Sequence, residues 1–266
     1  LCSWQCFTWH LQQHAMDWCL MTKIGFEFEF ATTLNFKEVR KELANYGIDV
    51  PYHLPNDNEY KQWRLVDDMS IGSRRSNSYF MHGQELISPP MSPKKAFKML
   101  AVVFKFMQDI KAETNTTTGL HVNMDIGKRA TRRIDPTKLI TLVDDEKVAK
   151  RYNRSRAYYA LPNKSKIRQQ AKYWTNLKNK PCKLVDYVKQ WGLTKDQLEE
   201  KYSAINFGNQ EDVGYLEFRM IGNRGYENRY KEISKDILHF EKCMYKAADA
   251  KDGNLAVTRR LNKMAA

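Results

Sequence analysis

Three short segments of this 266-residue chain alternate between apolar and polar side chains. They are residues 25–30 (GFEFEF), residues 119–124 (GLHVNM) and residues 216–220 (LEFRM). Because side chains along a β-strand point alternately to its two faces, each segment is predicted to be a strand with one apolar and one polar face. Such strands are typical of an antiparallel sheet that helices cover on one face only.

The polar faces of these segments carry side chains with related chemistry. If the strands share a sheet, the residues that gather are Glu27, Glu29, His121, Glu217 and Arg219. Carboxylates bind divalent cations, and an arginine beside them can bind phosphate. Two carboxylates on one strand face lie about 7 Å apart and repel each other. The alternatives are a solvated acidic face on the first strand and an internal ion pair on the third.

The composition limits the classes of protein that this chain can belong to. Hydrophobic residues make up 42% of it, enough for a sizeable core in one large domain or two small ones. No apolar run approaches the roughly 20 residues that cross a membrane. The net charge of +13 favours anionic partners without distinguishing among them. Five cysteines without regular spacing predict reduced thiols and a cytoplasmic location.

The first twenty residues differ from the rest, because they contain three Trp, three Cys and two His and almost no charge. We expect residues 1–20 to be an appended or disordered leader. The alternative is a zinc site formed by side chains at helical spacing, namely Cys2, Cys6, His10 and His14. Residues 21–250 are expected to form a single domain, and residues 251–266 a polar tail.

Further elements are predicted from periodicity and capping signals. Helices are predicted over residues 35–46, 93–113, 135–152 and 226–247. Additional short strands are predicted over residues 63–67, 84–88, 202–207 and 213–221. With weaker helical signals between residues 153 and 200, about six strands and six helices result, and they do not alternate strictly. The fold class is therefore predicted to be α+β, with a mostly antiparallel sheet, helices on one face and an open polar face.

Five sequence blocks occur in one order along the chain. They are GFEFE from residue 25, DDMS from 67, ELISPP from 85, GLHVN from 119, and YSAIN from 202, which is followed by LEFR from 216. Together they cover residues 22–223, and this arrangement resembles the amidoligase family, a branch of the glutamine synthetase-like carboxylate–amine ligases. The resemblance implies a glutamine synthetase-like catalytic fold with a curved sheet of about six strands.

The resemblance also implies an activity. Members of this fold group use ATP and Mg²⁺ or Mn²⁺ to transfer the γ-phosphate to a carboxylate, and an amine then attacks the acyl phosphate to form an amide. Metal ions held by carboxylates offset the repulsion between ATP and an anionic substrate. The partners expected are ATP and a small molecule, peptide or protein that bears a carboxylate or an amine.

Site residues carried over by position from the family form four groups. The expected metal ligands are Glu27, Glu29, Glu85, His121 and Glu217. The expected catalytic residues are His121 and Arg219. The expected nucleotide contacts are His121, Arg154, Arg156, Asn206 and Arg219. The expected substrate contacts are Asp68, Ser70 and Asn123.

The chain departs from its relatives at Asn123. Many relatives have the block Gly-Leu-His-Val-His, in which a second histidine stands where this chain has asparagine. An asparagine amide can donate and accept hydrogen bonds but does not titrate near neutral pH. A role in proton transfer is therefore not expected at this position.

Three other functions are compatible with the sequence. The basic residues 128–133 and the Tyr- and Arg-rich residues 151–173 are typical of nucleic-acid binding, although this function is less favoured. A catalytically inactive interaction protein on the same scaffold is the second alternative, and a metal-dependent hydrolase is the third. The composition, rich in Lys, Asn and Tyr, would suit a protein of a phage or of a low-GC host.

Overall fold

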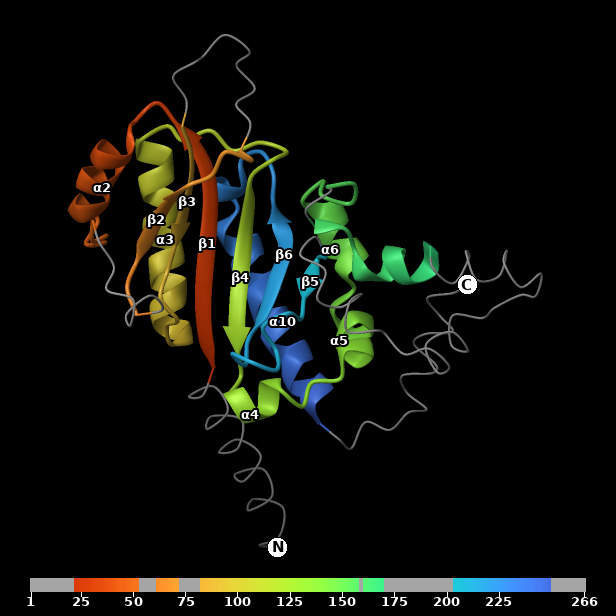
Figure 1. Ribbon diagram of the computed structural model, residues 1–266. Coiled ribbons are helices and arrows are strands. Elements are labelled where there is room, and N and C mark those ends of the chain that lie inside the picture. Colours follow the sequence, from red (N-terminus) through yellow and green to blue (C-terminus); the bar gives the residue numbers. More distant parts are fainter. Residues whose placement is uncertain (1–21, 53–60, 72–81, 158–159, 170–202, 250–266) are drawn as a thin grey trace, which may run out of the picture.

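The computed structural model describes residues 22–52, 61–71, 82–157, 160–169 and 203–249. Within these ranges the fold is α+β, with one open antiparallel sheet and helices packed mainly on one side of it (Figure 1). This confirms the predicted α+β class and the antiparallel open sheet. The predicted leader, its zinc alternative, the polar tail and the elements expected between residues 170 and 202 lie outside the described residues.

The sheet has six strands in the order β2-β3-β1-β4-β6-β5, and every pairing is antiparallel. The strands are β1 (Lys23–Thr32), β2 (Arg64–Asp67), β3 (His82–Ile87), β4 (Gly119–Asp125), β5 (Ile205–Asn206) and β6 (Leu216–Gly222). The three alternating segments thus lie side by side as β1, β4 and β6, in the centre of the sheet. Their convergence in one sheet, on which the predicted polar site depends, is confirmed.

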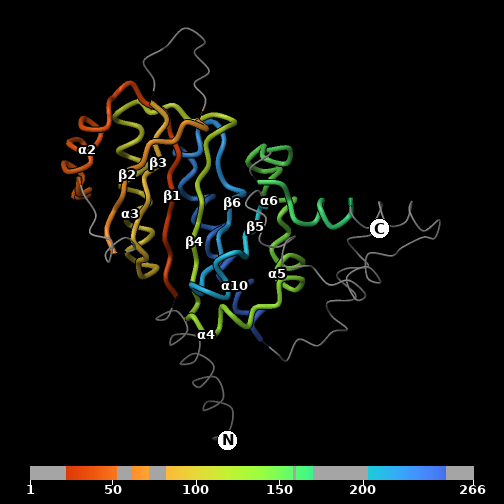
Figure 2. Tube along the Cα trace, in the orientation of Figure 1, coloured from red at the N-terminus to blue at the C-terminus, as the bar shows by residue number. Residues whose placement is uncertain are grey.

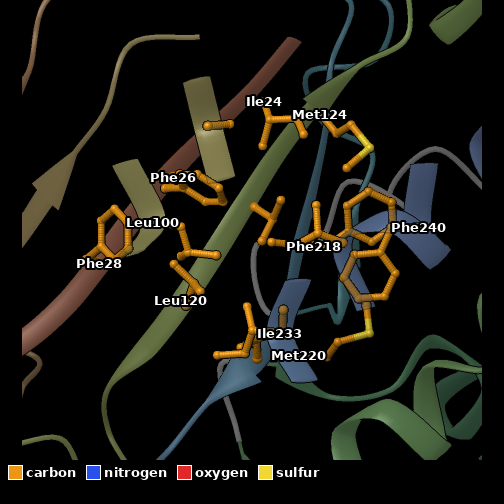
Figure 3. Packing of buried hydrophobic residues seen from close by; sticks show 14 of the residues in the cluster. Ile24, Phe26, Phe28, Leu100, Leu120, Met124, Phe218, Met220, Ile233 and Phe240 are labelled. Atoms are coloured by element: carbon orange, nitrogen blue, oxygen red, sulfur yellow. The ribbon is translucent and has the colours of Figure 1, made fainter. Parts of the chain in front are cut away.

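The apolar face of the sheet forms the core. Phe26 and Phe28 of β1, Leu120 of β4 and Phe218 of β6 are fully buried, in agreement with the predicted alternation. They pack against α3 (Pro93–Asp109) and α10 (Tyr230–Ala248) (Figure 3). The ring of Phe218 stacks on Phe240 of α10 with 4.5 Å between ring centroids. Because two long helices cover this face, the other face is left for polar side chains.

The shorter helices surround the edges of the sheet, as the Cα trace shows (Figure 2). They are α2 (Phe36–Asn45), α4 (Lys128–Thr131), α5 (Pro136–Val143), α6 (Asp145–Arg151) and the 3₁₀-helix η3 (Tyr226–Asn228). Helix α2 packs against β2, α5 against α10 and α6 against β6. Among the described residues, no helix combines the length and the apolarity that a membrane crossing requires.

Two helix predictions were wrong in their extent. The helix predicted over residues 93–113 ends at Asp109, because Lys111 adopts a φ of 52° and Glu113 pairs with Ala31 of β1. The helix predicted over residues 135–152 is two helices, since Asp144 adopts a left-handed conformation with a φ of 56°. The short helix α4 was not predicted. In the helices predicted over residues 93–113 and 135–152, tertiary pairing or one left-handed residue interrupts a continuous helical pattern.

A β-bulge shifts the register between β4 and β6. Leu120 pairs with Ile221, whereas Val122 pairs with Phe218, so two residues of β6 stand opposite His121. These two are Arg219 and Met220. The extra residue lets the apolar side chains of β6 stay in the core while Arg219 remains on the polar face beside His121.

Candidate functional site

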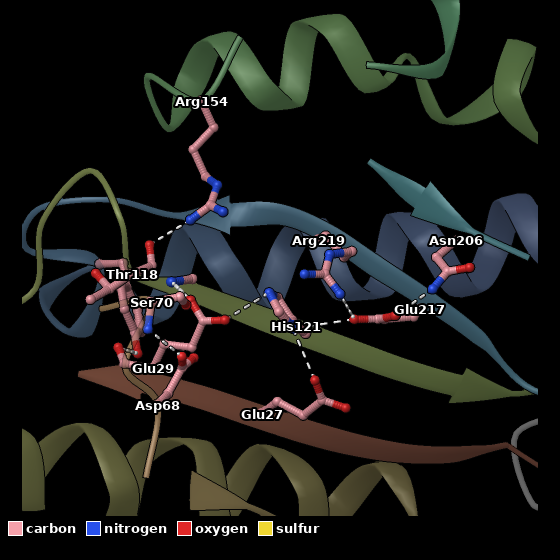
Figure 4. A network of polar contacts seen from close by, with 12 residues as sticks. Glu27, Glu29, Asp68, Ser70, Thr118, His121, Arg154, Asn206, Glu217 and Arg219 are labelled. Atoms are coloured by element: carbon pink, nitrogen blue, oxygen red, sulfur yellow. Dashed lines mark hydrogen bonds and ion pairs between the residues drawn. The ribbon is translucent and has the colours of Figure 1, made fainter. Parts of the chain in front are cut away.

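Acidic side chains from neighbouring strands surround His121 on the polar face (Figure 4). His121 Nδ1 lies 2.9 Å from Glu27 Oε2 and 3.2 Å from Glu217 Oε1. On the other side of the ring, Nε2 lies 3.3 Å from Glu29 Oε1, a distance suited to an ion pair, although Nε2 has no aligned hydrogen bond. Strand register explains this geometry, because Glu27 stands directly opposite His121.

Glu85 joins this cluster from β3, where it stands opposite Glu29 in the strand register. Glu27, Glu85 and His121 each offer a ligand atom, and these three atoms lie within 4.8 Å of one another. Two carboxylates and an imidazole are a suitable donor set for a divalent cation such as Mn²⁺ or Mg²⁺. The carboxylates of Glu29 and Glu217 lie beside the same histidine. The predicted metal ligands are therefore brought together, and they fit such an ion.

Electrostatic coupling within the cluster shifts several pKa values. Burial and Arg219 oppose protonation of His121, but Glu29, Glu217 and Glu27 outweigh them and raise its pKa to about 10. Burial favours the neutral form of Glu27, yet its contacts with His121 and Asn123 lower its pKa to about 2. Glu85 behaves in the opposite way, because burial and the charge of Glu27 raise its pKa to about 8. Near neutral pH one carboxyl group of the cluster thus holds a proton that a cation would displace.

Neighbouring side chains hold the two carboxylates that flank the histidine. Asn123 Nδ2 donates to Glu27 Oε1 at 2.7 Å, and Asn206 Nδ2 donates to Glu217 Oε2 at 2.9 Å. Arg219 Nη1 donates to Glu217 Oε1 at 2.6 Å. The contact between Glu217 and Arg219, considered above as a mere ion pair, is thus part of a larger network. These contacts fix the carboxylate planes around His121.

Arg154 extends toward this network from the segment that follows α6 (Figure 4). Its side chain is buried, Nη1 donates to the carbonyl oxygen of Thr118, and Nε has no hydrogen-bond partner. Two glycines make room for it, since a Cβ at Gly222 would lie 2.2 Å from Nη1 and one at Gly119 would lie 3.1 Å from it. Burial lowers the pKa of Arg154. Arg156, by contrast, is exposed to solvent.

The predicted substrate contacts have different surroundings. Asn123 lies within the network, but Asp68 and Ser70 form a turn after β2, where Ser70 N donates to Asp68 Oδ1 at 2.8 Å. Backbone contacts tie this turn to Gly83 of β3. The observed bonds of Asp68 and Ser70 are those of a local turn, and they include no contact with His121 or its carboxylate partners among the described residues.

A cavity of about 550 Å³ adjoins the network at Glu27 and Asn123. It lies over the start of β1 and the end of β4, and the turn before β6 closes one side. Its charged lining includes Lys23, Asp125 and Lys128, which the sequence reasoning did not include in the site. Extending the strand alternation by one step would have placed Lys23 and Asp125 on the polar face, because they are register partners in β1 and β4.

Contacts with backbone groups were also missed. Gly119 N donates to Glu29 Oε2 at 2.5 Å, and the hydroxyl of Tyr226 donates to the carbonyl oxygen of Glu29 at 2.9 Å. Gly222, the last residue of β6, has a φ of 145°, a conformation that residues with a side chain rarely adopt. The two contacts of Glu29 join residues 90 and 197 positions apart, so local patterns carry no signal for them.

Comparison with known proteins gives one result that agrees with this geometry. The profile of the family described as "Putative amidoligase enzyme" matches residues 20–221, which is most of the chain and includes all six strands except the last residue of β6. No curated protein matches the chain.

Proposed function

Because the chain belongs to the amidoligase family, we propose that it is an ATP- and Mg²⁺-dependent ligase that joins a carboxylate to an amine through an acyl phosphate. The observation that carries this proposal is the convergence of Glu27, Glu85 and His121 within 4.8 Å. We assign the activity to a single domain, residues 21–250, with a glutamine synthetase-like fold. Its location would be the cytoplasm, where ATP is available.

The proposed metal ligands are the five clustered residues: Glu27, Glu29, Glu85, His121 and Glu217. Bound Mg²⁺ would neutralise phosphate charge and align the phosphoryl group with the carboxylate. A single Mg²⁺ keeps several of its waters and binds only one or two protein carboxylates. The five ligands, which come from four strands, are therefore sufficient for two ions. The strands are rigid elements, and this supports a site that is formed before the ligands bind.

The two buried arginines would stabilise negative charge on the transferring group. Arg219 lies beside Glu217 and His121, and Arg154 reaches the same region from the other side. Guanidinium groups suit phosphate and carboxylate oxygens because they offer several donors in one plane. We propose Arg219 and His121 as the catalytic residues and Arg154 as a contact for the phosphates.

The remaining residues would have supporting roles. Asn206 acts by orienting Glu217, and its own Oδ1 accepts a hydrogen bond from Gly208 N at 2.8 Å. Arg156, which is exposed, would meet the outer part of the nucleotide. Asp68 and Ser70 would contact the substrate from the edge of the sheet, and Asn123 would contact it beside Glu27.

The overall reaction balances as follows. A carboxylate oxygen of the first substrate attacks the γ-phosphorus of ATP, the bond to the β-phosphate oxygen breaks, and ADP leaves. The amine nitrogen of the second substrate then attacks the acyl carbon, the bond to the phosphate oxygen breaks, and the phosphate takes up the amine proton. A carboxylate is a poor electrophile, so this activation by ATP is what makes amide formation possible.

The test is phosphate release from ATP and Mg²⁺ in the presence of candidate carboxylates, amines and peptides, with the amide product identified by mass spectrometry. The wild type should release phosphate and be stabilised thermally by Mg²⁺–ATP, and Glu27→Gln should lose both properties. If Mg²⁺–ATP gives no thermal shift and Glu27→Gln behaves like the wild type, the proposal fails. Cleaved products without use of ATP would instead indicate a hydrolase, and salt-sensitive binding of DNA or RNA that Glu27→Gln retains would indicate a nucleic-acid-binding protein.

A further inference from the structure

The cavity of about 550 Å³ beside the metal cluster has a lining of mixed charge. Its inner end is formed by Glu27 of β1 and Asn123 of β4, and Asp125 lies further along β4. Lys23, Arg64 and Lys128 contribute positive charge, while apolar walls come from Ile87, Pro90, Val213 and Tyr215. The cavity is therefore neither a purely cationic pocket nor a purely apolar one.

Asn123 lines the cavity and has one acceptor atom without a protein partner. Its Nδ2 donates to Glu27 Oε1 at 2.7 Å, and its Oδ1 is buried without a hydrogen-bond partner. Rotating the amide by 180° would bring Oδ1 against the carboxylate of Glu27, so the observed orientation is the favoured one. An unpaired buried carbonyl oxygen is costly, and a ligand N–H group would satisfy it.

The charged residues at the other end of the cavity are arranged around Asp125. Asp125 Oδ1 accepts a hydrogen bond from Thr131 Oγ1 at 3.1 Å, and Lys23 is its partner in the strand register. The stem of Lys128 packs on Gly214, where an added Cβ would lie 3.2 Å from Lys128 Cβ. The ammonium groups of Lys23 and Lys128 act electrostatically on Asp125, and among the described residues neither forms a hydrogen bond or a close ion pair. Both can therefore bind a ligand carboxylate.

From this arrangement we infer that the cavity binds the amine partner of the reaction, and that this partner is an amino acid or short peptide that carries its own carboxylate. The amine N–H donates to Asn123 Oδ1 at the inner end, next to the metal cluster. The carboxylate is held by Lys23 and Lys128. This inference rests on the proposed ligase function, because it assigns the second substrate of that reaction.

A zwitterion fits this lining better than a nucleotide does. The triphosphate of ATP carries several negative charges, and the inner end of the cavity presents oxygen atoms of Glu27 and Asn123, with the carboxylate of Asp125 nearby. An amine meets these oxygens favourably, whereas phosphate oxygens would be repelled by them. The two lysines then account for the anionic end of the same ligand.

The first experiment measures binding to the full chain by saturation-transfer NMR and thermal shift. The probes are the twenty L-amino acids, diglycine and triglycine, in the presence of Mg²⁺ and the non-hydrolysable analogue AMP-PNP. For the tightest binder, one analogue that lacks the amine and one that lacks the carboxylate are compared. We expect at least one probe to bind together with AMP-PNP, and both analogues to bind at least tenfold more weakly.

Variants then locate the probe in the cavity. Asn123→Leu, which keeps the approximate size of the side chain, should weaken probe binding at least tenfold, and Lys128→Ala should weaken it several-fold. The matched controls are Asn45→Leu and Lys95→Ala, both at exposed positions outside the cavity, and they should leave probe binding unchanged. Lys128 is exposed, so its variant tests the inference even if Asn123→Leu does not fold.

Three results would overturn the inference. One is that no probe binds, and another is that the analogue without the amine binds as tightly as the parent. The third is that AMP-PNP displaces the probe and Lys128→Ala weakens AMP-PNP, which would make the cavity the nucleotide site and leave the ligase proposal intact. Failure of the proposed function has a different signature, namely no thermal shift with Mg²⁺ and AMP-PNP in the wild type.

Discussion

The two faces of the central sheet are built from the same strands but use burial in opposite ways. On the apolar face, Phe26 and Phe218 are fully buried and pack against helices. On the polar face, His121 and Glu217 are only 3% and 6% exposed, so they are buried almost as completely. Around His121, exposure therefore does not distinguish the two faces, although Glu27 and Glu85 at the same cluster are only half-buried. What differs is the free energy of burying the groups that each face carries.

Burial of apolar area stabilises the fold by about 25 cal/mol per Å². Burial of a carboxylate costs free energy that only partners can offset, and pairing rarely does more than compensate for it. On the polar face the compensation is incomplete, since the pKa of Glu85 is raised to about 8 by burial and by Glu27. The comparison indicates that one face stabilises the domain, while the other holds an electrostatic cost that a bound cation would relieve.

The largest effect is expected from a core truncation. Phe218→Ala removes a buried ring that stacks on Phe240 at 4.5 Å, and it should lower the free energy of unfolding by about 3–5 kcal/mol. Chemical denaturation measures this value. Leu238→Ala, at a position that is 52% exposed on α10, is the matched control and should change the value by less than about 0.5 kcal/mol. A similar loss in both variants would contradict the assignment of this face as the main source of stability.

The second prediction concerns Glu85→Gln, which should raise the stability of the fold at high pH but weaken metal binding. Glu85→Gln keeps the size of the side chain but removes a carboxyl group whose pKa is raised to about 8. A raised carboxyl pKa means that the folded state loses stability as pH rises from the ordinary value of 4.5 toward 8. At pH 9 the variant should therefore be more stable than the wild type by roughly 2–5 kcal/mol, the upper value being the full pKa shift without solvent screening, and at pH 4 equally stable.

The same variant should bind Mn²⁺ at least tenfold more weakly, because one of the three clustered ligands is lost. Isothermal titration calorimetry measures the affinity, and denaturation at both pH values measures the stability. Glu113→Gln, a carboxyl group outside the cluster, serves as the control. Unchanged metal affinity together with unchanged stability at pH 9 would show that Glu85 is a solvated surface residue and not part of a metal site.

The fold could be predicted to the extent that it depends on local patterns. Alternation in GFEFEF, GLHVNM and LEFRM was sufficient to predict which side chains of each strand face the core. It also predicted the polar set that converges on His121. Period-two alternation is a strong signal because a shift of one residue would exchange the two faces of the strand.

The missed features depend on contacts between distant parts of the chain. The bulge opposite His121 changes no local pattern, and the left-handed conformation of Asp144 interrupts a sequence that is otherwise helical. The burial of Arg154 depends on space left by Gly119 and Gly222, which are far from it in the sequence. The positions of Asp68 and Ser70 in a turn show that membership of a family block does not by itself place a side chain in the network.

A smaller effect is expected when the affinity for Mn²⁺ is measured as a function of pH. His121, with a pKa of about 10, and Glu85, with a pKa of about 8, both hold protons near neutral pH that a cation must displace. The affinity for Mn²⁺ should therefore rise about tenfold per pH unit for each proton released between pH 6 and 8. Calorimetry in two buffers of different ionisation enthalpy counts the protons, and Glu85→Gln should release one fewer. An affinity that does not change with pH would contradict the assigned protonation states.

The smallest effect is expected from a substitution at the start of α2, and it tests whether metal binding on the polar face depends on the stability of a distant helix. Asn35 caps α2, accepting hydrogen bonds from the backbone N–H groups of Lys37 and Glu38, while the side chain of Glu38 accepts one from Asn35 N. Asn35→Ala should lower the free energy of unfolding by about 1 kcal/mol. Lys37→Ala, an exposed position in the first turn of the same helix, should have a smaller effect.

Helix α2 packs at the β2 edge of the sheet, where it contributes no residue to the cluster around His121. The affinity for Mn²⁺ should therefore stay within twofold of the wild type in Asn35→Ala, although the variant unfolds at a lower temperature. If the cap variant weakened metal binding as much as Glu85→Gln does, metal affinity would depend on the edge of the sheet as much as on the cluster around His121. The contrast between a stabilising face and a binding face would then be wrong, because a change remote from the polar face would affect binding as strongly as the loss of a ligand.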